Sequence, residues 1–313
     1  MEPEKVYELI KVVTANDFNI CKRNLWEIMK ITNSLLIDRS IEKNYFETER
    51  QQSSDLLLQR VLMYGASIYN LTDGVSYAVK NHTIPKIYDP FSMKVLLRGL
   101  LESYLTLYHI NFSDTEMEND IRYKIWVQYS LAQRGKMSFL FLSEDDTKNL
   151  NNEKEYVQTL ISEIKSSEFF VRLDQKKQEK FLNLINRDWK LGFNQKSFNR
   201  FSWQQLIDNT GINKILFSDV YNFLSWFSHS TFLSITQLKD FYQNELQIEE
   251  TKSVIKETSI FIALACTDLI KIDTELKNQY FKLPQSEKDL INSYNYVYRG
   301  EKYTIEDIRN VRK

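Results

Sequence analysis

Two apolar segments that lie far apart in the chain each carry a stripe of polar side chains. The first segment carries Arg98, Glu102 and His109, and the second carries Tyr221, Ser225, Ser228 and His229. Residues three, four, seven or eleven positions apart return to one face of an α-helix, so each stripe should occupy a single helix face. Charged groups in apolar helices are rarely left without partners, so the two stripes should pair with each other or line a site.

The residue types in these stripes suit acid–base chemistry at a phosphate ester. A histidine such as His229 can accept or donate a proton near neutral pH. Arg98, aimed by Glu102, would stabilise the negative charge that develops around phosphorus. Tyr221 and Ser225 would orient the substrate or support these groups. The alternative is structural: an Arg98–Glu102 salt bridge fixes the helix register, and His229 is a hydrogen-bonded core histidine.

A carboxylate interrupts the most apolar part of the chain. Asp268 lies within the segment 260–270, whose other members are mostly apolar, and a carboxylate there needs a partner. Arg98 and His229 are the natural candidates, which would make Asp268 a further member of the cluster. The alternative is that Asp268 faces the surface of the domain. His109 is explained more simply, because a histidine is favourable near a helix C-terminus.

The segment 172–203 is the one locally basic stretch, with eight basic and three acidic residues and interleaved aromatic side chains. Basic side chains contact phosphates and aromatic rings stack on bases, so this pattern indicates a nucleic-acid contact. The candidate residues are Lys176, Lys177, Lys180, Arg187, Lys190, Lys196 and Arg200. A solvated helix face followed by an anchored loop would give the same pattern.

The composition predicts a large all-α protein. Only 7 Gly and 4 Pro occur in 313 residues, too few for many hairpins or sandwich loops. Helical periodicity runs through the chain, so we expect a multi-helix bundle. The segment from about Glu249 to Lys282 is apolar nearly all round in its middle, which predicts a long central buried helix.

The spacing of apolar residues and helix caps places the other elements. It predicts a helix from about Ser54 to Lys80, a loop from residue 81 to Pro90, and a new helix opened by Asp89 and Pro90. We expect residues 1–50 to form an N-terminal helical arm and residues 51–313 to form the main helical domain. The alternative is one single domain over 1–313, because no linker or composition shift marks a boundary.

Several classes of function are disfavoured by the sequence. Three histidines and two distant cysteines do not suit a zinc site, and no phosphate loop or dinucleotide motif occurs, so we expect no metal or cofactor. The net charge is -1, so any anion-binding site must come from a local patch. The longest fully apolar run, 260–266, is too short for a bilayer span and no signal peptide is apparent. We therefore expect a cytoplasmic protein without membrane contact.

The order and spacing of four motifs resemble the family called domain of unknown function 5677. The motifs are Arg98-x-x-x-Glu102, Trp189-x-x-Gly192, a short helix capped by Ser202 and stopped by Gly211, and Tyr221-x-x-x-Ser225-x-x-x-His229. The resemblance covers about residues 55–280, although only these short motifs carry it.

That family resembles the HEPN superfamily of helical bundles, found in bacterial toxins, abortive-infection proteins and phage-defence systems. HEPN ribonucleases are typically homodimers that cleave RNA without a metal, through an arginine and a histidine spaced R-x(4–6)-H. This sequence departs from the pattern, because no arginine precedes His229 or His109 at that spacing.

The resemblance therefore implies a HEPN-like fold and an effector of a bacterial defence or toxin system. It implies a metal-independent endoribonuclease with His229 as acid or base and Arg98 as phosphate stabiliser. It further implies a homodimer, RNA as a ligand, and a partner protein encoded in the same defence operon. The alternative is a non-catalytic helical interaction or regulatory module, in which the polar cluster is structural.

Overall fold

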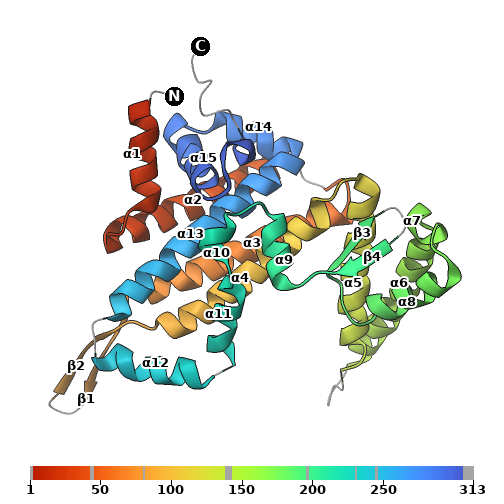
Figure 1. Ribbon diagram of the computed structural model, residues 1–313, viewed down its shortest axis with the longest axis horizontal. Coiled ribbons are helices and arrows are strands. Elements are labelled where there is room, and N and C mark those ends of the chain that lie inside the picture. The colour runs from red at the N-terminus through yellow and green to blue at the C-terminus, as the bar shows by residue number, and fades with distance from the viewer. Residues whose placement is uncertain are drawn as a thin grey trace. The chain divides into compact units, whose positions relative to one another are not determined.

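The computed structural model describes residues 3–42, 46–79, 82–137, 143–194, 197–229, 231–243 and 246–305 (Figure 1). The fold is all-α, as predicted, and the described strands form only two short antiparallel hairpins. The chain divides into two compact units, one formed by residues 1–108 and 207–313 and the other by residues 109–206. No helix in the described part of the chain is both long and apolar enough to cross a membrane.

The first unit is a bundle of long helices with one hairpin. Its elements are α1 (Pro3–Thr14), α2 (Phe18–Glu42), α3 (Glu49–Leu71), β1 (Val75–Val79), β2 (His82–Ile87), most of α4 (Pro90–Asn111), the end of α9 (Trp203–Asn209), α10 (Lys214–Phe217), α11 (Val220–Ser228), α12 (Phe232–Gln243), α13 (Leu246–Ile272), α14 (Thr274–Lys282), α15 (Gln285–Arg299) and the 3-10 turn Glu301–Tyr303. The segment 1–50, for which a separate arm is predicted, supplies α1 and α2 to this unit.

Helix α13 is the buried centre of the first unit. Every residue from Thr258 to Ile270 is buried, and the helix packs against α2, α3 and α15 (Figure 1). Apolar residues on all faces of a helix favour this central position. The predicted central helix is thus present, but it ends at Ile272. Asp273 then accepts a hydrogen bond from the backbone of Leu276 (2.9 Å) and caps α14, so the helix does not continue to Lys282.

The predicted helix from Ser54 to Lys80 and the predicted loop after it are wrong at their junction. Helix α3 ends at Leu71, and β1 pairs antiparallel with β2. Gly74, with φ of 62°, supplies the left-handed backbone that lets the chain leave the helix and enter the strand. The apolar residues after Leu71 therefore continue a strand rather than another helical turn.

The second unit has its own apolar core. Its elements are the last residues of α4, then α5 (Glu116–Arg134), α6 (Glu144–Ser166), α7 (Glu168–Val171), α8 (Gln175–Ile185), β3 (Leu191–Asn194), β4 (Ser197–Arg200) and the start of α9. The core is built around Phe169, Phe181 and Leu191. The β3–β4 hairpin, in which Leu191 pairs with Arg200, has no counterpart among the predicted elements.

Two helices of the first unit present the predicted polar stripes. Helix α4 begins as predicted: Pro90 is its first residue, and Asp89 accepts a hydrogen bond from the backbone of Ser92 (3.0 Å). Helix α11 is short and buries Leu224 and Phe227 on one side. The polar residues Tyr221, Ser225 and Ser228 of α11 are only partly buried.

Candidate functional site

The polar stripes of α4 and α11 meet at the guanidinium of Arg98. Its Nε donates to Glu102 Oε1 (3.0 Å) and its Nη2 donates to Tyr221 Oη (2.8 Å). The Tyr221 hydroxyl in turn donates to the same Glu102 oxygen (2.9 Å). These three side chains form a closed hydrogen-bonded triangle that joins the two helices, so the predicted meeting of the stripes is confirmed.

The end of α11 adds two further side chains to the Arg98 guanidinium. Nη1 donates to Ser228 Oγ and lies 3.5 Å from His229 Nε2, at the limit of a hydrogen bond. Ser228 follows Tyr221 by seven residues and therefore lies on the predicted polar face. No function was predicted for Ser228 from the sequence. The cluster therefore consists of Arg98, Glu102, Tyr221, Ser228 and His229, which we call the Arg98 cluster.

Ser225 lies on the same side of α11 but does not reach Arg98 through a described contact. Its hydroxyl donates to the backbone oxygen of Tyr221 (2.8 Å), one turn earlier in the same helix. The hydroxyl of Ser228 likewise donates to the backbone oxygen of Ser225 (3.0 Å). Ser225 thus supports the local geometry of α11, and Ser228 rather than Ser225 contacts Arg98.

The electrostatics of the Arg98 cluster keep its arginine charged and its tyrosine protonated. Burial lowers the pKa of Arg98, but the hydrogen bond with Tyr221 and the charge of Glu102 outweigh burial and raise it. Burial, together with the neighbouring carboxylate of Glu102, raises the pKa of Tyr221 to about 12. At neutral pH Tyr221 is therefore a phenol that donates, as its bond to Glu102 requires.

The cluster lies at the surface of the first unit rather than in its core. The Arg98 side chain is 20% exposed, and His229, at the C-terminal end of α11, is exposed. The core histidine expected under the structural alternative is therefore not what the structure shows at His229. An oriented guanidinium stands beside an imidazole that solvent can reach.

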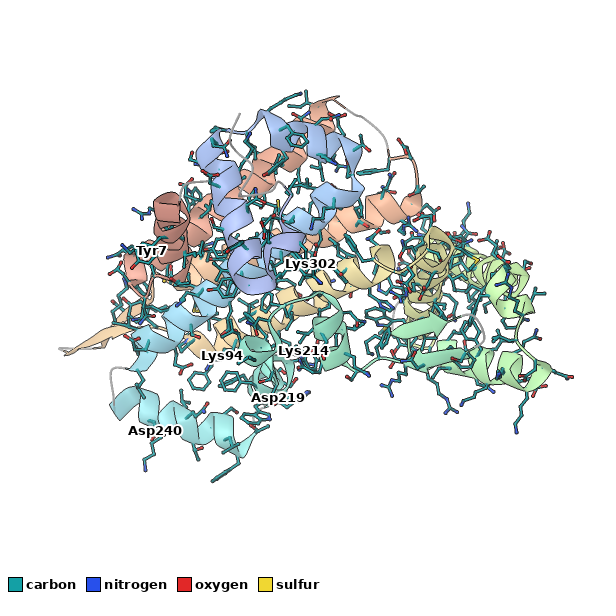
Figure 2. The ribbon with its side chains drawn as sticks, turned by 45° about the horizontal axis from the view of Figure 1, so that its top comes forward. Tyr7, Lys94, Lys214, Asp219, Asp240 and Lys302 are labelled. Carbon is teal, nitrogen blue, oxygen red and sulfur yellow. The ribbon has the colours of Figure 1, made fainter. Side chains whose placement is uncertain are left out.

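Lys94 precedes Arg98 by one helical turn and fastens α4 to α11 in a different way. Its Nζ donates to Glu250 Oε2 (2.7 Å) and lies 4.1 Å from the ring centroid of Phe227 and 4.8 Å from that of Phe223 (Figure 2). A desolvated ammonium over aromatic faces is a favourable contact. The spacing of four residues from Arg98 is the sequence feature by which Lys94 could have been found.

The prediction that Asp268 pairs with Arg98 or His229 is wrong. Asp268 is fully buried, where its Oδ1 accepts from Arg299 Nη1 (2.8 Å) and its Oδ2 accepts from Tyr104 Oη (3.0 Å). Helix α15 packs against α13 and brings Arg299 to the Asp268 carboxylate. Arg299 lies on a different helix, so residue spacing within one helix could not predict this pair. The alternative position at the domain surface is also excluded, because Asp268 is 1% exposed.

His109 belongs to the second unit and is buried there. Its ring makes edge contacts with Trp189 (5.5 Å between centroids) and Phe201 (6.0 Å), and its Nε2 has no hydrogen-bond partner among the described residues. Burial, together with the charges of Arg122 and Lys190, lowers the pKa of His109 well below its ordinary value. His109 is therefore a neutral core histidine and not a proton-exchanging group near pH 7.

The basic stretch 172–203 divides into exposed and buried members. Lys176, Lys177 and Lys180 are exposed on α8, and Arg187 is exposed just after it. Lys177 is paired with Asp174 (3.3 Å), and Lys196 lies outside the described residues. The exposed face of α8 remains the part of this stretch that suits a contact with phosphates.

The prediction that Lys190 contacts nucleic acid is wrong. Lys190 is buried, its Nζ donates to Asp188 Oδ1 (2.7 Å), and it lies 5.0 Å from the Trp203 ring. Asp188 also pairs with Arg200, whose side chain is otherwise exposed. Lys190 thus neutralises a buried carboxylate, which is what burial of either charge requires.

The interleaved aromatic residues of this stretch also face inward. Phe193 and Phe198 pack on Phe181 of the second core, and Trp189 packs on Trp203. Their rings are used in packing and are not arranged as a stacking surface for bases.

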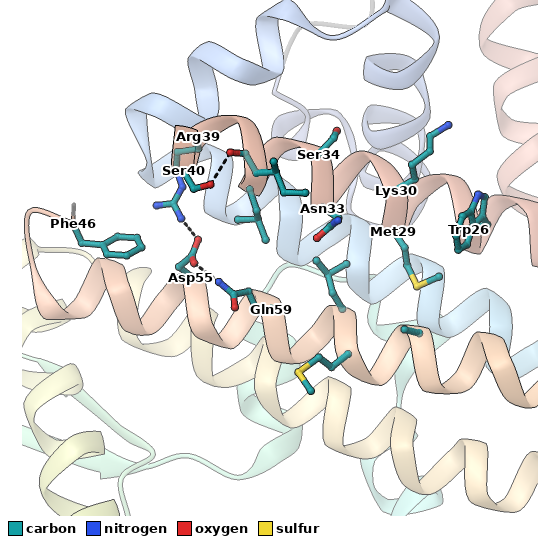
Figure 3. Close-up of a pocket in the computed structure, with 15 residues that line it drawn as sticks. Trp26, Met29, Lys30, Asn33, Ser34, Arg39, Ser40, Phe46, Asp55 and Gln59 are labelled. Atoms are coloured by element: carbon teal, nitrogen blue, oxygen red, sulfur yellow. Dashed lines mark hydrogen bonds and ion pairs between the residues drawn. The ribbon is translucent and has the colours of Figure 1, made fainter. Parts of the chain in front are cut away.

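A separate pocket of about 930 Å³ lies between α2 and α3 (Figure 3). Trp26, Ile37 and Met63 are among its apolar lining residues. At one end, Arg39 of α2 is directed toward Asp55 of α3, and Gln59 donates to the same carboxylate (2.6 Å) (Figure 3). None of the predicted site residues lines this pocket.

Among the described residues, no group of three His, Cys, Asp or Glu side chains is placed to hold a metal ion. Comparison of the chain with protein-family models, curated proteins and solved structures finds no match.

Proposed function

We propose that the Arg98 cluster is an acid–base site for metal-independent cleavage of RNA. The observation that carries the proposal is the geometry around Arg98. Two side chains hold its guanidinium in a fixed orientation, and His229 stands at its edge with Nε2 3.5 Å from Nη1. A preorganised cation beside a solvent-accessible imidazole is what charge stabilisation and proton transfer at a phosphodiester require.

In the proposed reaction His229 accepts the proton of a ribose 2′-hydroxyl. The 2′ oxygen then attacks phosphorus, the bond from phosphorus to the 5′ oxygen breaks, and that oxygen takes a proton from water. Arg98 stabilises the extra negative charge on the phosphoryl oxygens during this displacement, and Glu102 and Tyr221 keep its guanidinium aimed. The product ends are a 2′,3′-cyclic phosphate and a 5′-hydroxyl.

The biological setting is part of the same proposal. The resemblance of the Arg98-x-x-x-Glu102 and Tyr221-x-x-x-Ser225-x-x-x-His229 motifs supports a HEPN-like effector of a bacterial defence or toxin system. It also supports a homodimer, a partner protein from the same operon and a cytoplasmic location. The exposed lysines of α8 would guide RNA through its phosphates.

A second candidate function is a non-catalytic interaction module. The observation that favours it is that each nitrogen of the Arg98 guanidinium donates a hydrogen bond within the protein. Its Nε donates to Glu102, its Nη1 donates to Ser228 and its Nη2 donates to Tyr221, while Nη1 also lies 3.5 Å from His229 Nε2. A guanidinium so fully used suits a structural link between α4 and α11 as well as it suits catalysis.

The two candidates are separated by an RNA-cleavage assay in the presence of EDTA. We expect the wild type to cleave single-stranded RNA and His229→Ala to lose roughly 100-fold or more of the rate. Asn222→Ala is the matched control, because Asn222 is exposed on the same helix and belongs to no part of the cluster. The control should cleave like the wild type. Equal rates for all three proteins, or no cleavage by any, would favour the interaction module.

A further inference from the structure

Helix α12 presents four large apolar residues to solvent, which are Phe232, Leu233, Ile235 and Leu238. Phe232 is 81% exposed, Ile235 55% and Leu238 39%, whereas the small polar Ser234 is only 4% exposed. A helix on the surface of a finished globular unit normally shows the reverse pattern. The exposed side of α12 therefore has the composition of a side that is covered by a partner.

The three exposed residues lie on one face of α12. Each residue advances the helix by about 100°, so Phe232, Ile235 and Leu238 fall within roughly 120° of one another. Leu233 is exposed beside this stripe. We call the stripe of Phe232, Ile235 and Leu238 the α12 face.

The elements that precede α12 in the chain add further exposed apolar side chains. Ile215 and Leu216 of α10 and Trp226 of α11 are exposed, and the backbone of Thr231 donates to the oxygen of Trp226 (3.3 Å), which ties the start of α12 to α11. Five large apolar side chains of α11 and α12 are thus exposed: Trp226, Phe232, Leu233, Ile235 and Leu238. With about 100 Å² from each, one copy would contribute about 500 Å², and a two-fold pair would bury about 1,000 Å², which is the lower limit for a specific interface.

The charges of this region indicate what kind of partner fits. Over the segment 213–243 the charged residues are Lys214, Asp219, Lys239 and Asp240, which sum to zero (Figure 2). Nucleic acid and anionic lipid surfaces both attract basic surfaces, so a neutral aliphatic surface suits neither. A surface that is apolar and balanced in charge is complementary to itself, which is the condition for a two-fold symmetric contact.

We infer that the α12 face binds the α12 face of a second copy of this chain about a two-fold axis. In an antiparallel pair centred on Ile235, this residue packs against Ile235 of the second copy, and Phe232 packs against Leu238. The axis passes near the Arg98 cluster, because His229 precedes Phe232 by three residues. The inference gives the proposed homodimer its surface and rests on that part of the proposed function, not on RNA cleavage.

A symmetric cross-link tests the pairing directly. Ile235→Cys places two thiols across the proposed axis, and the native Cys21 and Cys266 are buried and do not compete. Under mild oxidation we expect Ile235→Cys to form a disulfide-linked dimer. Met63→Cys is the control, since Met63 is 71% exposed on α3, and it should remain largely uncross-linked. Cross-linking of both variants to the same extent, or of neither, overturns the inference.

Sedimentation of the full-length chain gives an independent measurement. The wild type should sediment at twice the mass of one chain, and Ile235→Glu at the mass of one chain with an unchanged melting temperature, because Ile235 contributes little to the core. Leu56→Glu, at an exposed position on α3, should remain dimeric. A monomeric wild type, or a dimeric Ile235→Glu, contradicts the inference. Since neither readout involves RNA, a confirmed dimer without cleavage would remove the proposed reaction alone.

Discussion

Arg98 makes most of the polar contacts that join α4 to α11. It binds Glu102 within its own helix and Tyr221 and Ser228 on the other, and it stands beside His229. His109, the histidine of the first polar stripe, does not reach the Arg98 cluster. It is enclosed by aromatic rings in the second unit. Two histidines that look alike in the sequence thus occupy opposite environments, one exposed and one buried.

The burial of His109 predicts a dependence of stability on pH. Its folded pKa lies well below its ordinary value, so the unfolded chain binds a proton below about pH 6.5 while the folded chain does not. The free energy of unfolding should therefore fall by about 1.4 kcal/mol per pH unit as the pH drops through this range. Urea denaturation between pH 7.5 and 5 measures this slope.

The variant His109→Phe isolates this contribution. Phenylalanine keeps the edge contacts with Trp189 and Phe201 but cannot bind a proton. The slope of the unfolding free energy against pH should therefore decrease by the contribution of about one proton. If His109→Phe and the wild type lose stability equally over this range, His109 is not the group responsible.

At the level of elements, the sequence was sufficient for the all-α class, for the start of α4 and for the meeting of α4 with α11. The 100° periodicity placed Arg98, Glu102, Tyr221 and His229 on facing stripes, and capping residues placed the start of α4. The partner of Asp268 could not be predicted in the same way, because Arg299 lies on α15 and reaches it only through tertiary packing. The end of α3 and the two hairpins were missed for a local reason, since short apolar runs suit a strand as well as a helix.

The contact of Lys94 with α11 leads to a prediction at the same scale. Lys94→Met removes both the bond to Glu250 and the interactions with the rings of Phe223 and Phe227. We expect a loss of about 2 kcal/mol in the free energy of unfolding, because the ammonium is desolvated. Chemical denaturation measures it, and Lys277→Met, at an exposed position of α14, is the control. A loss no greater than that of the control would show that Lys94 does not hold α11.

At the level of the whole molecule, the chemistry and the exposed apolar surface belong to the same unit. The Arg98 cluster and the α12 face both lie in the unit formed by residues 1–108 and 207–313, and only two residues of chain separate His229 from Phe232. The exposed lysines of α8 lie in the other unit. Under the proposed function, one unit would serve assembly and catalysis and the other would attract RNA phosphates.

The most direct test of this account is chemical rescue of the proposed acid–base group. His229→Ala should cleave RNA slowly in EDTA, and free imidazole added to the reaction should restore part of the rate, because a small imidazole can replace the lost side chain. Imidazole should not restore Arg98→Ala, which lacks the guanidinium instead. Rescue by imidazole is thus expected for His229→Ala alone. An active wild type whose His229→Ala variant either keeps full activity or gains nothing from imidazole would contradict it.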